Sequence, residues 1–224
     1  MTFHAQIASP LGPILLCSEG QLLSGLYFTG QADCPVVDGV PAHSPSAGRP
    51  SAGMMDGLAI RKFKAYKNAA GNLFGLGSGY SADKALVDTM ADESGGWQLL
   101  QTETPAATLA LFKQTQSELH EYFAGRRKTF SVPLAVSGTD FQKKVWDALL
   151  TIPYGQTVAY GDVARTAGLS ARHGRPVGTA VGRNPITIII PCHRVLSGTG
   201  TLTGYTGGLE RKYALLELEG FTLR

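Results

Sequence analysis

The chain has 224 residues, of which 43% are hydrophobic and 17% are charged, and this length allows one large domain or two small ones. No apolar run approaches the roughly 18 residues of a membrane span and the N-terminus lacks a secretory signal pattern, so we expect a cytoplasmic protein without membrane contact. The formal net charge is +3, and the three cysteines are an odd and sparse set, which argues against a disulfide framework and leaves at least one thiol free.

The first 28 residues predict β-strands. Short apolar stretches between Phe3 and Phe28 are separated by turn sequences at residues 9–13 and at Glu19-Gly20. Cys17 ends one of these stretches, and a small buried hydrophobic residue is its simplest interpretation.

The next segment lacks the apolar patterning of a folded element. From Gln31 to about Gly57 it is rich in Pro, Gly, Ser and Ala, which predicts a loop or disorder. Residues 61–67 alternate cations with aromatic side chains, a pattern that suits a solvated helix face and less well a nucleic-acid contact. Glycines at 75, 77 and 79 have no following Lys-Ser or Lys-Thr, so they do not predict a phosphate loop.

A helix is predicted after this segment. Thr104 is its expected N-cap, Pro105 its first residue and Gly125 its end. The apolar positions near helical spacing are Leu109, Phe112, Leu119, Tyr122 and Phe123. Residues 126–135 then form a connector into a second unit.

The second unit begins with a strong helix signal. Thr139 followed by Gln142 predicts a capping box. The apolar stripe of this helix is Phe141, Val145, Ala148, Leu149 and Ile152. Residues 157–167 predict a second helix, and a turn at residues 168–170 leads to a third, as in a helix-turn-helix.

Pro176 decides where the third helix begins. A proline inside a helix costs about 3 kcal/mol, so we place Pro176 at the first helical position, with Arg175 projecting from the helix entrance. Gly178, Ala180 and Gly182 then form a face almost without side chains. Such a face lets another backbone approach closely, in a groove or in tight helix packing.

The residues before Cys192 carry the strongest chemical signal. An apolar run after Asn184 predicts a buried strand that leads into Pro191-Cys192. A free thiol with a pKa near 8.5 is only about 3% ionised at pH 7. We therefore expect His193 and a carboxylate to lower the pKa of Cys192.

Several motifs together indicate a family. They are Pro-Cys-His-Arg-Val at residues 191–195 after Asn184-Pro185, Gly-Tyr-Thr-Gly-Gly at residues 204–208, and Arg211-Lys212. This combination resembles the O6-alkylguanine-DNA alkyltransferases, most closely the bacterial type. The resemblance runs from about residue 119 to 220 and includes residues 9–13 and 25–28.

The resemblance implies a two-domain fold. Residues 1–125 would form an α/β domain, ribonuclease H-like, with a long insertion at about 31–104 that has no counterpart in the family. Residues 126–135 would form the connector. Residues 136–224 would form a mostly α, winged-helix-like domain that contains the helix-turn-helix and the active site.

The resemblance also implies a reaction. An alkyl group would pass from O6-alkylguanine, and from O4-alkylthymine, in duplex DNA to Cys192 in one irreversible turnover, without a cofactor or metal. The partner would be double-stranded DNA, bound by a monomer that needs no other protein. Ten basic and eleven acidic residues precede Ser137 and ten basic against six acidic follow it, nets of −1 and +4, which favours the C-terminal part for DNA contact.

The family's catalytic roles carry over to five positions. Cys192 would be the acceptor, His193 the base that takes its proton through a water, and Glu219 the carboxylate that orients the imidazole. Tyr160 would donate a hydrogen bond to the departing guanine. Asn184 would join the DNA-reading helix to the active-site strand.

Other positions would bind the alkyl group or the DNA. The implied pocket residues are Val195, Tyr205, Thr206, Gly207 and Lys212. The implied DNA-binding residues are Arg175, Gly178, Ala180, Gly182 and Arg183. Arg175 would fill the gap left by the extruded nucleotide, although Pro176 stands where a small residue is common. Lys212 would also brace the loop around Cys192, and Arg194 would tie that loop to the fold.

Two rival functions come from other classes. A lesion-sensing module that does not catalyse transfer would lack the acceptor cysteine, which is present here. A Cys-His hydrolase would turn over repeatedly and need oxyanion donors. Cys17, Cys34 and His43 match no common zinc spacing, and His4, His120 and His173 are interpreted as surface or partly buried residues.

Overall fold

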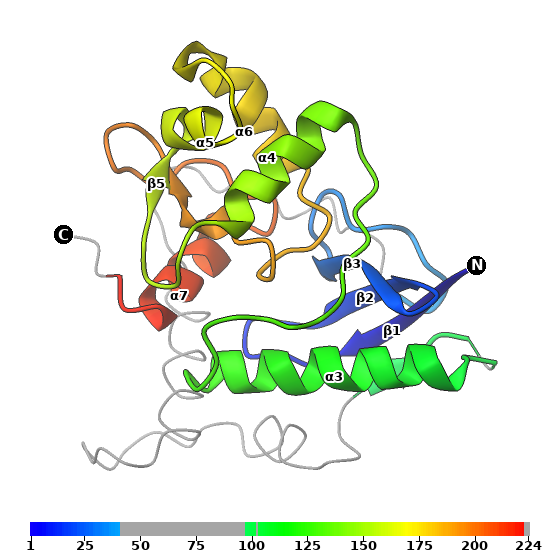
Figure 1. Cartoon of the computed structure of the whole chain (residues 1–224). Helices are drawn as coiled ribbons and strands as arrows, with labels where there is room; N and C mark the ends of the chain where they lie inside the picture. The colour runs from blue at the N-terminus through cyan, green and yellow to red at the C-terminus, as the bar shows by residue number, and fades with distance from the viewer. Residues whose placement is uncertain (41–96, 102, 222–224) are drawn as a thin grey trace, which may run out of the picture.

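The computed structural model describes residues 1–40, 97–101 and 103–221 of the chain. In this part, a small β-sheet lies against one long helix, and a group of shorter helices lies beyond the sheet (Figure 1). The expectations for residues 41–57, 61–67 and 75–79, and for His43, lie outside the described residues.

The predicted N-terminal strands are confirmed. Strands β1 (Thr2–Ile7), β2 (Ile14–Glu19) and β3 (Leu22–Phe28) pair antiparallel, and β4 (Trp97–Leu99) adds to the other side of β1. Within the described residues the sheet order is β3-β2-β1-β4. Residues 31–40 form turns without a regular element, as their composition predicts.

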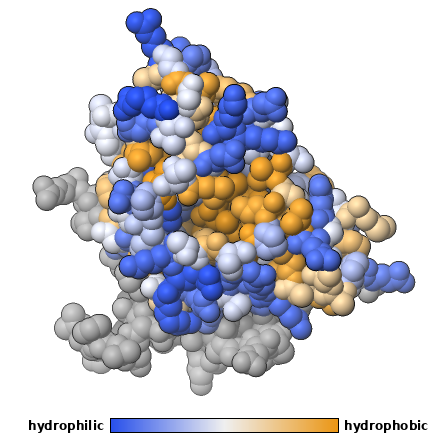
Figure 2. All heavy atoms as spheres, viewed as in Figure 1, coloured by the Kyte–Doolittle hydropathy of each residue, from blue (hydrophilic) through white to orange (hydrophobic). Residues whose placement is uncertain are grey.

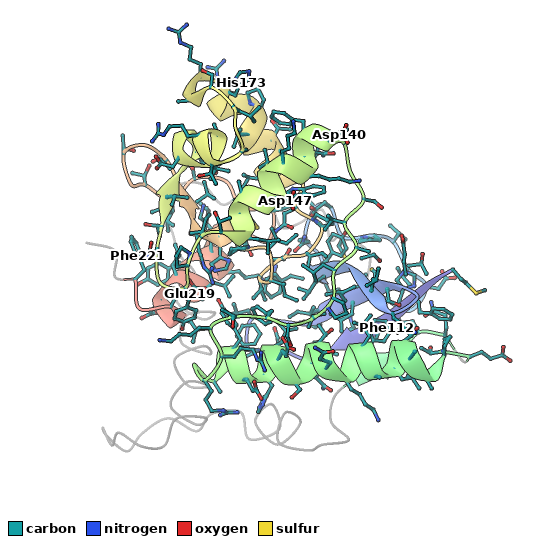
Figure 3. All side chains as sticks on the ribbon, in the orientation of Figure 1. Phe112, Asp140, Asp147, His173, Glu219 and Phe221 are labelled. Atoms are coloured by element: carbon teal, nitrogen blue, oxygen red, sulfur yellow. The ribbon has the colours of Figure 1, made fainter. Side chains whose placement is uncertain are left out.

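Helix α3 (Ala106–Phe123) covers one face of this sheet (Figure 1). Phe112, labelled in Figure 3, is fully buried on its inner side. Gly125 follows the helix with φ of 73°, so the predicted end is confirmed. The predicted N-cap is wrong by one residue: Pro105 occupies the N-cap, and the Thr104 hydroxyl donates to the Gln101 carbonyl instead.

The free edge of β3 joins the two parts of the chain. Leu23 N donates to Pro133 O at 2.8 Å in the connector, and Ala135 N donates back to Leu23 O at 2.9 Å. Further along the strand, Leu26 N donates to Pro185 O and Thr187 N donates to Leu26 O, both at 2.9 Å. The N-terminal sheet therefore holds the backbone that leads to Cys192.

The second part opens with helices that follow one another closely along the chain. Helix α4 (Asp140–Leu150) begins with the predicted capping box, in which Thr139 Oγ1 accepts from Gln142 N and Gln142 Oε1 accepts from Thr139 N. Strand β5 (Val158–Ala159) precedes helix α5 (Tyr160–Thr166). The predicted helix at residues 157–167 therefore begins three residues late, because its first residues pair with another strand.

Helix α6 (Gly174–Gly182) follows a 3-10 turn, η1 (Ala171–His173). The prediction that Pro176 opens this helix is wrong, because Pro176 is its third residue. That position still lies in the first turn, where backbone N–H groups have no partner within the helix, so proline is tolerated. Arg175 is exposed at the second helical position.

The remaining elements are η2 (Cys192–Arg194), β6 (Val195–Leu196), which pairs parallel with β5, and helix α7 (Leu209–Leu218). The predicted strand before Cys192 is not formed. Residues 186–190 are buried but follow a series of turns, in which Ile188 has φ of 73°. A positive φ interrupts strand geometry, and the chain instead curls around the side chain of Asn184.

The hydrophobic core is continuous across both parts within the described residues, from Ile14 in β2 to Leu215 in α7. On the face seen in Figure 2, apolar side chains gather between the upper helices and α3. Along the described stretches, no helix is both long and apolar enough to cross a membrane.

Candidate active site

Cys192 is the first residue of η2 and lies beneath a small pocket. The residue is 7% exposed, and its backbone N donates to Ile190 O at 2.8 Å. The fixed φ of Pro191, at −82°, sets the direction in which the chain enters this turn. The thiol is therefore held in one place by the backbone on both sides.

Asn184 fixes the segment that carries this thiol. Its Nδ2 donates to Ile190 O at 2.8 Å and to Cys192 Sγ at 3.0 Å, while its Oδ1 accepts from Ile186 N at 3.0 Å. Asn184 follows the C-cap of α6, so one buried amide connects the end of that helix with the reactive sulfur.

The expectation of a lowered thiol pKa is wrong. Burial raises the pKa of Cys192 to about 11, because a thiolate loses its hydration there. The hydrogen bond from Asn184 and the positive charge of Lys212 act in the opposite direction and do not overcome burial. The thiol therefore keeps its proton in the free protein, and a base must accept that proton during any reaction.

His193 and Glu219 form a buried pair next to the thiol residue. His193 Nε2 lies 2.9 Å from Glu219 Oε1, and neither side chain has exposed surface. Burial by itself raises the pKa of Glu219, but the hydrogen bonds and charges of His193 and Arg194 hold that pKa well below its usual range. The ionised carboxylate must accept, so Nε2 carries the imidazole hydrogen.

This assignment leaves Nδ1 of His193 as the basic nitrogen. Burial lowers the pKa of His193, against the opposing effect of Glu219, so the imidazole is neutral. Nδ1 is buried and makes no hydrogen bond to the described residues. It is therefore able to accept a proton.

Arg194 supports the same carboxylate. Its Nε donates to Glu219 Oε2 and its Nη2 to Glu219 Oε1, each at 2.9 Å, while Nη1 donates to Ile152 O at 2.6 Å. Such a bidentate pair is directional, and it fixes both oxygens of the carboxylate. Arg194 thus ties η2 to the end of α4 and to the end of α7.

A pocket of about 200 Å³ opens above Cys192. It lies between Tyr160 at the start of α5, the inner side of α6, and a loop at residues 204–206, here called the pocket loop. Its lining residues are Tyr160, Gly178, Val181, Gly182, Cys192, Gly204, Tyr205 and Thr206. Val181 and Gly204 had not been predicted as pocket residues. No local motif distinguishes Val181 from a core residue, whereas Gly204 opens the Gly-Tyr-Thr-Gly-Gly motif at residues 204–208 and could have been found from it.

Contacts across the pocket join its walls. The Thr206 hydroxyl donates to Gly182 O at 2.6 Å, which links the pocket loop to α6. A Cβ on Gly178 would lie 3.6 Å from the Tyr160 ring, so this ring stands against α6. A flat group that enters the pocket would thus meet tyrosine side chains, glycine backbone from both α6 and the pocket loop, and the sulfur.

Three predicted pocket residues lie behind the wall instead. Val195 is fully buried in β6, and Lys212 is fully buried with its Nζ donating to Val195 O at 2.6 Å and Thr203 O at 2.9 Å. Gly207 is also buried, and a Cβ there would come within 2.7 Å of the Tyr205 ring. These residues support the pocket loop, and burial lowers the pKa of Lys212 to about 8.

The predicted DNA-binding residues do not share one face. Gly178 and Gly182 face the pocket, whereas Ala180 is buried against α4, and Trp146 Nε1 donates to its carbonyl at 2.9 Å. Positions two apart in a helix point in different directions, so a face of 178, 180 and 182 was wrong. Arg175 and Arg183 are exposed near the two ends of α6.

The remaining thiols and histidines lie elsewhere. Cys17 is buried in β2, where burial raises its pKa to about 12. Figure 3 shows His173 at the tip of the helical part, far from Glu219, and His4 bonds to the Gln101 side chain. Among the described residues, no group of three or more His, Cys, Asp or Glu could hold a metal ion.

Comparisons with known protein sequences all point to one family of methyltransferases. The family model "6-O-methylguanine DNA methyltransferase, DNA binding domain" matches residues 140–221, and the model for its "ribonuclease-like domain" matches residues 85–136. A methylated-DNA–protein-cysteine methyltransferase of Mycobacterium bovis is 47% identical over 66% of this chain and 84% of its own. One from Methanosarcina acetivorans is 52% identical over 49% of this chain and 69% of its own.

Solved structures give the same result. The crystal structure of Mycobacterium tuberculosis O6-methylguanine methyltransferase aligns with a TM-score of 0.60 and 34% identity, covering 98% of this chain and 93% of that one. The structure of Mycobacterium tuberculosis OGT in complex with DNA aligns with a TM-score of 0.60 and 33% identity, over 96% and 90% of the two chains.

Proposed function

The chain belongs to the family of methylated-DNA–protein-cysteine methyltransferases, and from this premise we propose that its own Cys192 is the acceptor in repair of alkylated DNA. The activity is transfer of a methyl group from methylated DNA to a cysteine of the protein itself. The substrate is duplex DNA that contains O6-alkylguanine, and by the resemblance also O4-alkylthymine. The protein acts once, because S-alkylcysteine is not converted back.

One observation supports the choice of Cys192 above all others. Its sulfur lines a pocket of about 200 Å³, and the next residue is a neutral imidazole bonded to an ionised carboxylate. Cys17, by contrast, is a buried strand residue that packs with Leu15 and Val40. Cys192 therefore combines access, a base and a fixed position.

The reaction is a displacement at the alkyl carbon. His193 Nδ1 takes the thiol proton, through a water in the family's mechanism, as the sulfur forms its bond to carbon. The bond from carbon to O6 breaks, and its electron pair returns to the guanine ring. Tyr160, which also lines the pocket, donates its hydroxyl proton to this charge, so that the restored base leaves neutral. Tyr160 then regains a proton from water, and His193 releases the thiol proton to water, so the reaction has no net change in protons.

The raised pKa of Cys192 suits such a mechanism. A thiol that stays protonated in the free protein is protected from unrelated electrophiles. Proton transfer to His193 then accompanies attack on a bound base instead of preceding it. Glu219 stabilises the imidazolium that forms, as the carboxylate does in a hydrolase triad.

Base flipping would bring the lesion to the sulfur. We propose that α5 and α6 act as a helix-turn-helix in a winged-helix-like domain, with α6 against the minor groove. Arg175 would enter the stack where the nucleotide leaves, at a cost of a few kcal/mol that a poorly paired base reduces. Arg183, exposed just after α6, would contact phosphate.

The remaining expectations are part of the same proposal. The N-terminal sheet with α3 would be the ribonuclease H-like domain at residues 1–125, the connector would span 126–135, and residues 136–224 would form the DNA-binding domain. We propose that the protein acts in the cytoplasm as a monomer.

Intact-mass analysis tests the function directly. Mixed with a duplex containing O6-methylguanine, the protein should gain the mass of one methylene group, located on the peptide containing Cys192. Cys192→Ala should bind the duplex without gaining mass, while the matched control Cys17→Ala should still gain it. Mass gain by Cys192→Ala, or a label on another residue, would contradict the assignment.

The same experiment separates the rival functions. A lesion-sensing module is not favoured, because a thiol lies in the pocket. A Cys-His hydrolase would release product repeatedly from an ester or amide. One equivalent of methyl transfer followed by no turnover excludes it.

A further inference from the structure

The carboxylate of Glu219 accepts hydrogen bonds from several directions among the described residues. Oε1 accepts from His193 Nε2 and Arg194 Nη2, and Oε2 accepts from Arg194 Nε and from Gly155 N at 3.1 Å. Tyr122 adds another, since its hydroxyl donates to Oε1 at 2.8 Å. Of the donors in the described part of the chain, Tyr122 alone comes from the N-terminal part.

Tyr122 is rigidly placed on α3. Its side chain has no exposed surface, and its ring centroid lies 5.6 Å from that of Phe123, 5.4 Å from that of Phe130 and 6.2 Å from that of Tyr154. Burial and the nearby charge of Glu219 raise the pKa of Tyr122 well above its ordinary value. The phenol therefore keeps its proton and always acts as the donor.

The hydroxyl and the imidazole share one oxygen. Because Tyr122 and His193 both donate to Oε1, the hydroxyl takes part of the negative charge that this oxygen would offer the imidazole. It also resists rotation of the carboxylate away from His193. A side chain that only filled the core at this position would need neither a hydroxyl group nor a hydrogen bond to the Glu219 carboxylate.

We infer that Tyr122 is a positioning residue for the Cys192 reaction: it fixes the oxygen of Glu219 that binds His193 and limits how basic the imidazole becomes. The inference rests on the proposed function and extends it. It gives the N-terminal part a role in the chemistry beyond supporting the fold.

The direction of the effect follows from charge. Without the hydroxyl, Oε1 carries more negative charge and stabilises the imidazolium more, so the pKa of His193 rises. His193 must be neutral to accept the thiol proton, and the acid limb of the rate profile should therefore move to higher pH. Looser positioning should lower the maximal rate as well.

Tyr122→Phe tests this with Tyr154→Phe as a matched control. Both changes remove one phenol oxygen from neighbouring rings, but the Tyr154 hydroxyl donates to the backbone carbonyl of Leu218 at 3.0 Å and not to the carboxylate. The measurement is the single-turnover rate of methyl transfer at saturating O6-methylguanine duplex, from pH 5 to 9, with duplex affinity measured separately.

We expect Tyr122→Phe to lower the maximal rate about three- to tenfold, because only part of the energy of one hydrogen bond to a charged group is lost from the transition state. The acid limb should move to higher pH, with unchanged duplex affinity. Tyr154→Phe should leave both the maximal rate and the pH of the acid limb unchanged. An unmoved limb in Tyr122→Phe, or equal slowing in both variants, would overturn the inference.

Two NMR measurements do not depend on methyl transfer. The pKa of the His193 imidazole should be higher in Tyr122→Phe than in the wild type and in Tyr154→Phe, and equal values would refute the coupling. In the chain with Tyr122 intact, Glu219→Gln should shift the ring carbon that bears the Tyr122 hydroxyl. A resonance that does not move would overturn the inference even if Tyr122→Phe failed to fold. If the wild type transferred no methyl group, the proposed function would fail while these titrations still decided the role of Tyr122.

Discussion

Asn184→Ala should both lower the stability of the fold and make the thiol of Cys192 less acidic. The change removes three buried hydrogen bonds, to Ile190 O, to Cys192 Sγ and from Ile186 N. Ile190 O still accepts from Cys192 N, so the main group left without a partner is the Ile186 N–H. Each lost hydrogen bond costs about 1 kcal/mol, a value that already contains part of the penalty for the unpaired Ile186 N–H. We therefore expect the free energy of unfolding to fall by about 3 kcal/mol.

Urea denaturation and calorimetry measure this loss. For a chain of this size, about 3 kcal/mol corresponds to a fall of roughly 6 to 12 °C in Tm. Gln98→Ala is the control, since Gln98 is exposed on β4 and its removal should change stability by less than about 0.5 kcal/mol. A loss below about 1 kcal/mol for Asn184→Ala would refute the view that this amide holds the active-site segment.

The thiol gives a second readout of the same change. The hydrogen bond from Asn184 Nδ2 favours the thiolate, so its removal should raise the pKa of Cys192 above about 11. Alkylation of Cys192 by iodoacetamide, followed by peptide mass analysis across pH, should then require higher pH than in the wild type. An unchanged profile would mean that burial alone sets the reactivity of the thiol.

Two further outcomes are expected. The folded protein holds the pKa of Glu219 below its ordinary value of 4.5, so this group adds stability that is present above pH 4.5 and lost as the pH falls toward the folded pKa. The urea concentration at the unfolding midpoint should therefore decrease as the pH is lowered below about 4.5, and it should decrease less steeply in Glu219→Gln. Parallel slopes in the two proteins would disprove the linkage. Arg175→Ala should slow methyl transfer from duplex DNA while leaving iodoacetamide alkylation of Cys192 unchanged, because Arg175 is exposed on α6 and outside the pocket lining; equal transfer by wild type and variant would exclude the finger role.

Local patterns in the sequence determined much of the fold. The capping box at Thr139 and Gln142, the left-handed glycine after α3 and the turns between β1, β2 and β3 were predicted and confirmed. Each depends on a few consecutive residues, whose backbone preferences hold in almost any surroundings. The adjacency of Cys192 and His193 was likewise evident from the sequence.

Only the tertiary structure decided the rest. The path of the segment before Cys192 differs from the local prediction because the hydrogen bonds of the buried Asn184 amide outweigh the strand preference of the apolar run. The sequence could not show that Val181 lines the pocket and that Val195 lies behind it. Nor could it bring together Tyr122 and Glu219, which are 97 positions apart.

The state of the thiol shows the same division. A Cys-His pair in the sequence suggests an ionised sulfur, yet burial raises the pKa of Cys192 to about 11. Desolvation depends on every atom around the sulfur, most of them contributed by distant segments. The sequence by itself therefore determined which atoms can react, and the folded structure determined where they lie, which of them carry protons and how the N-terminal part takes part.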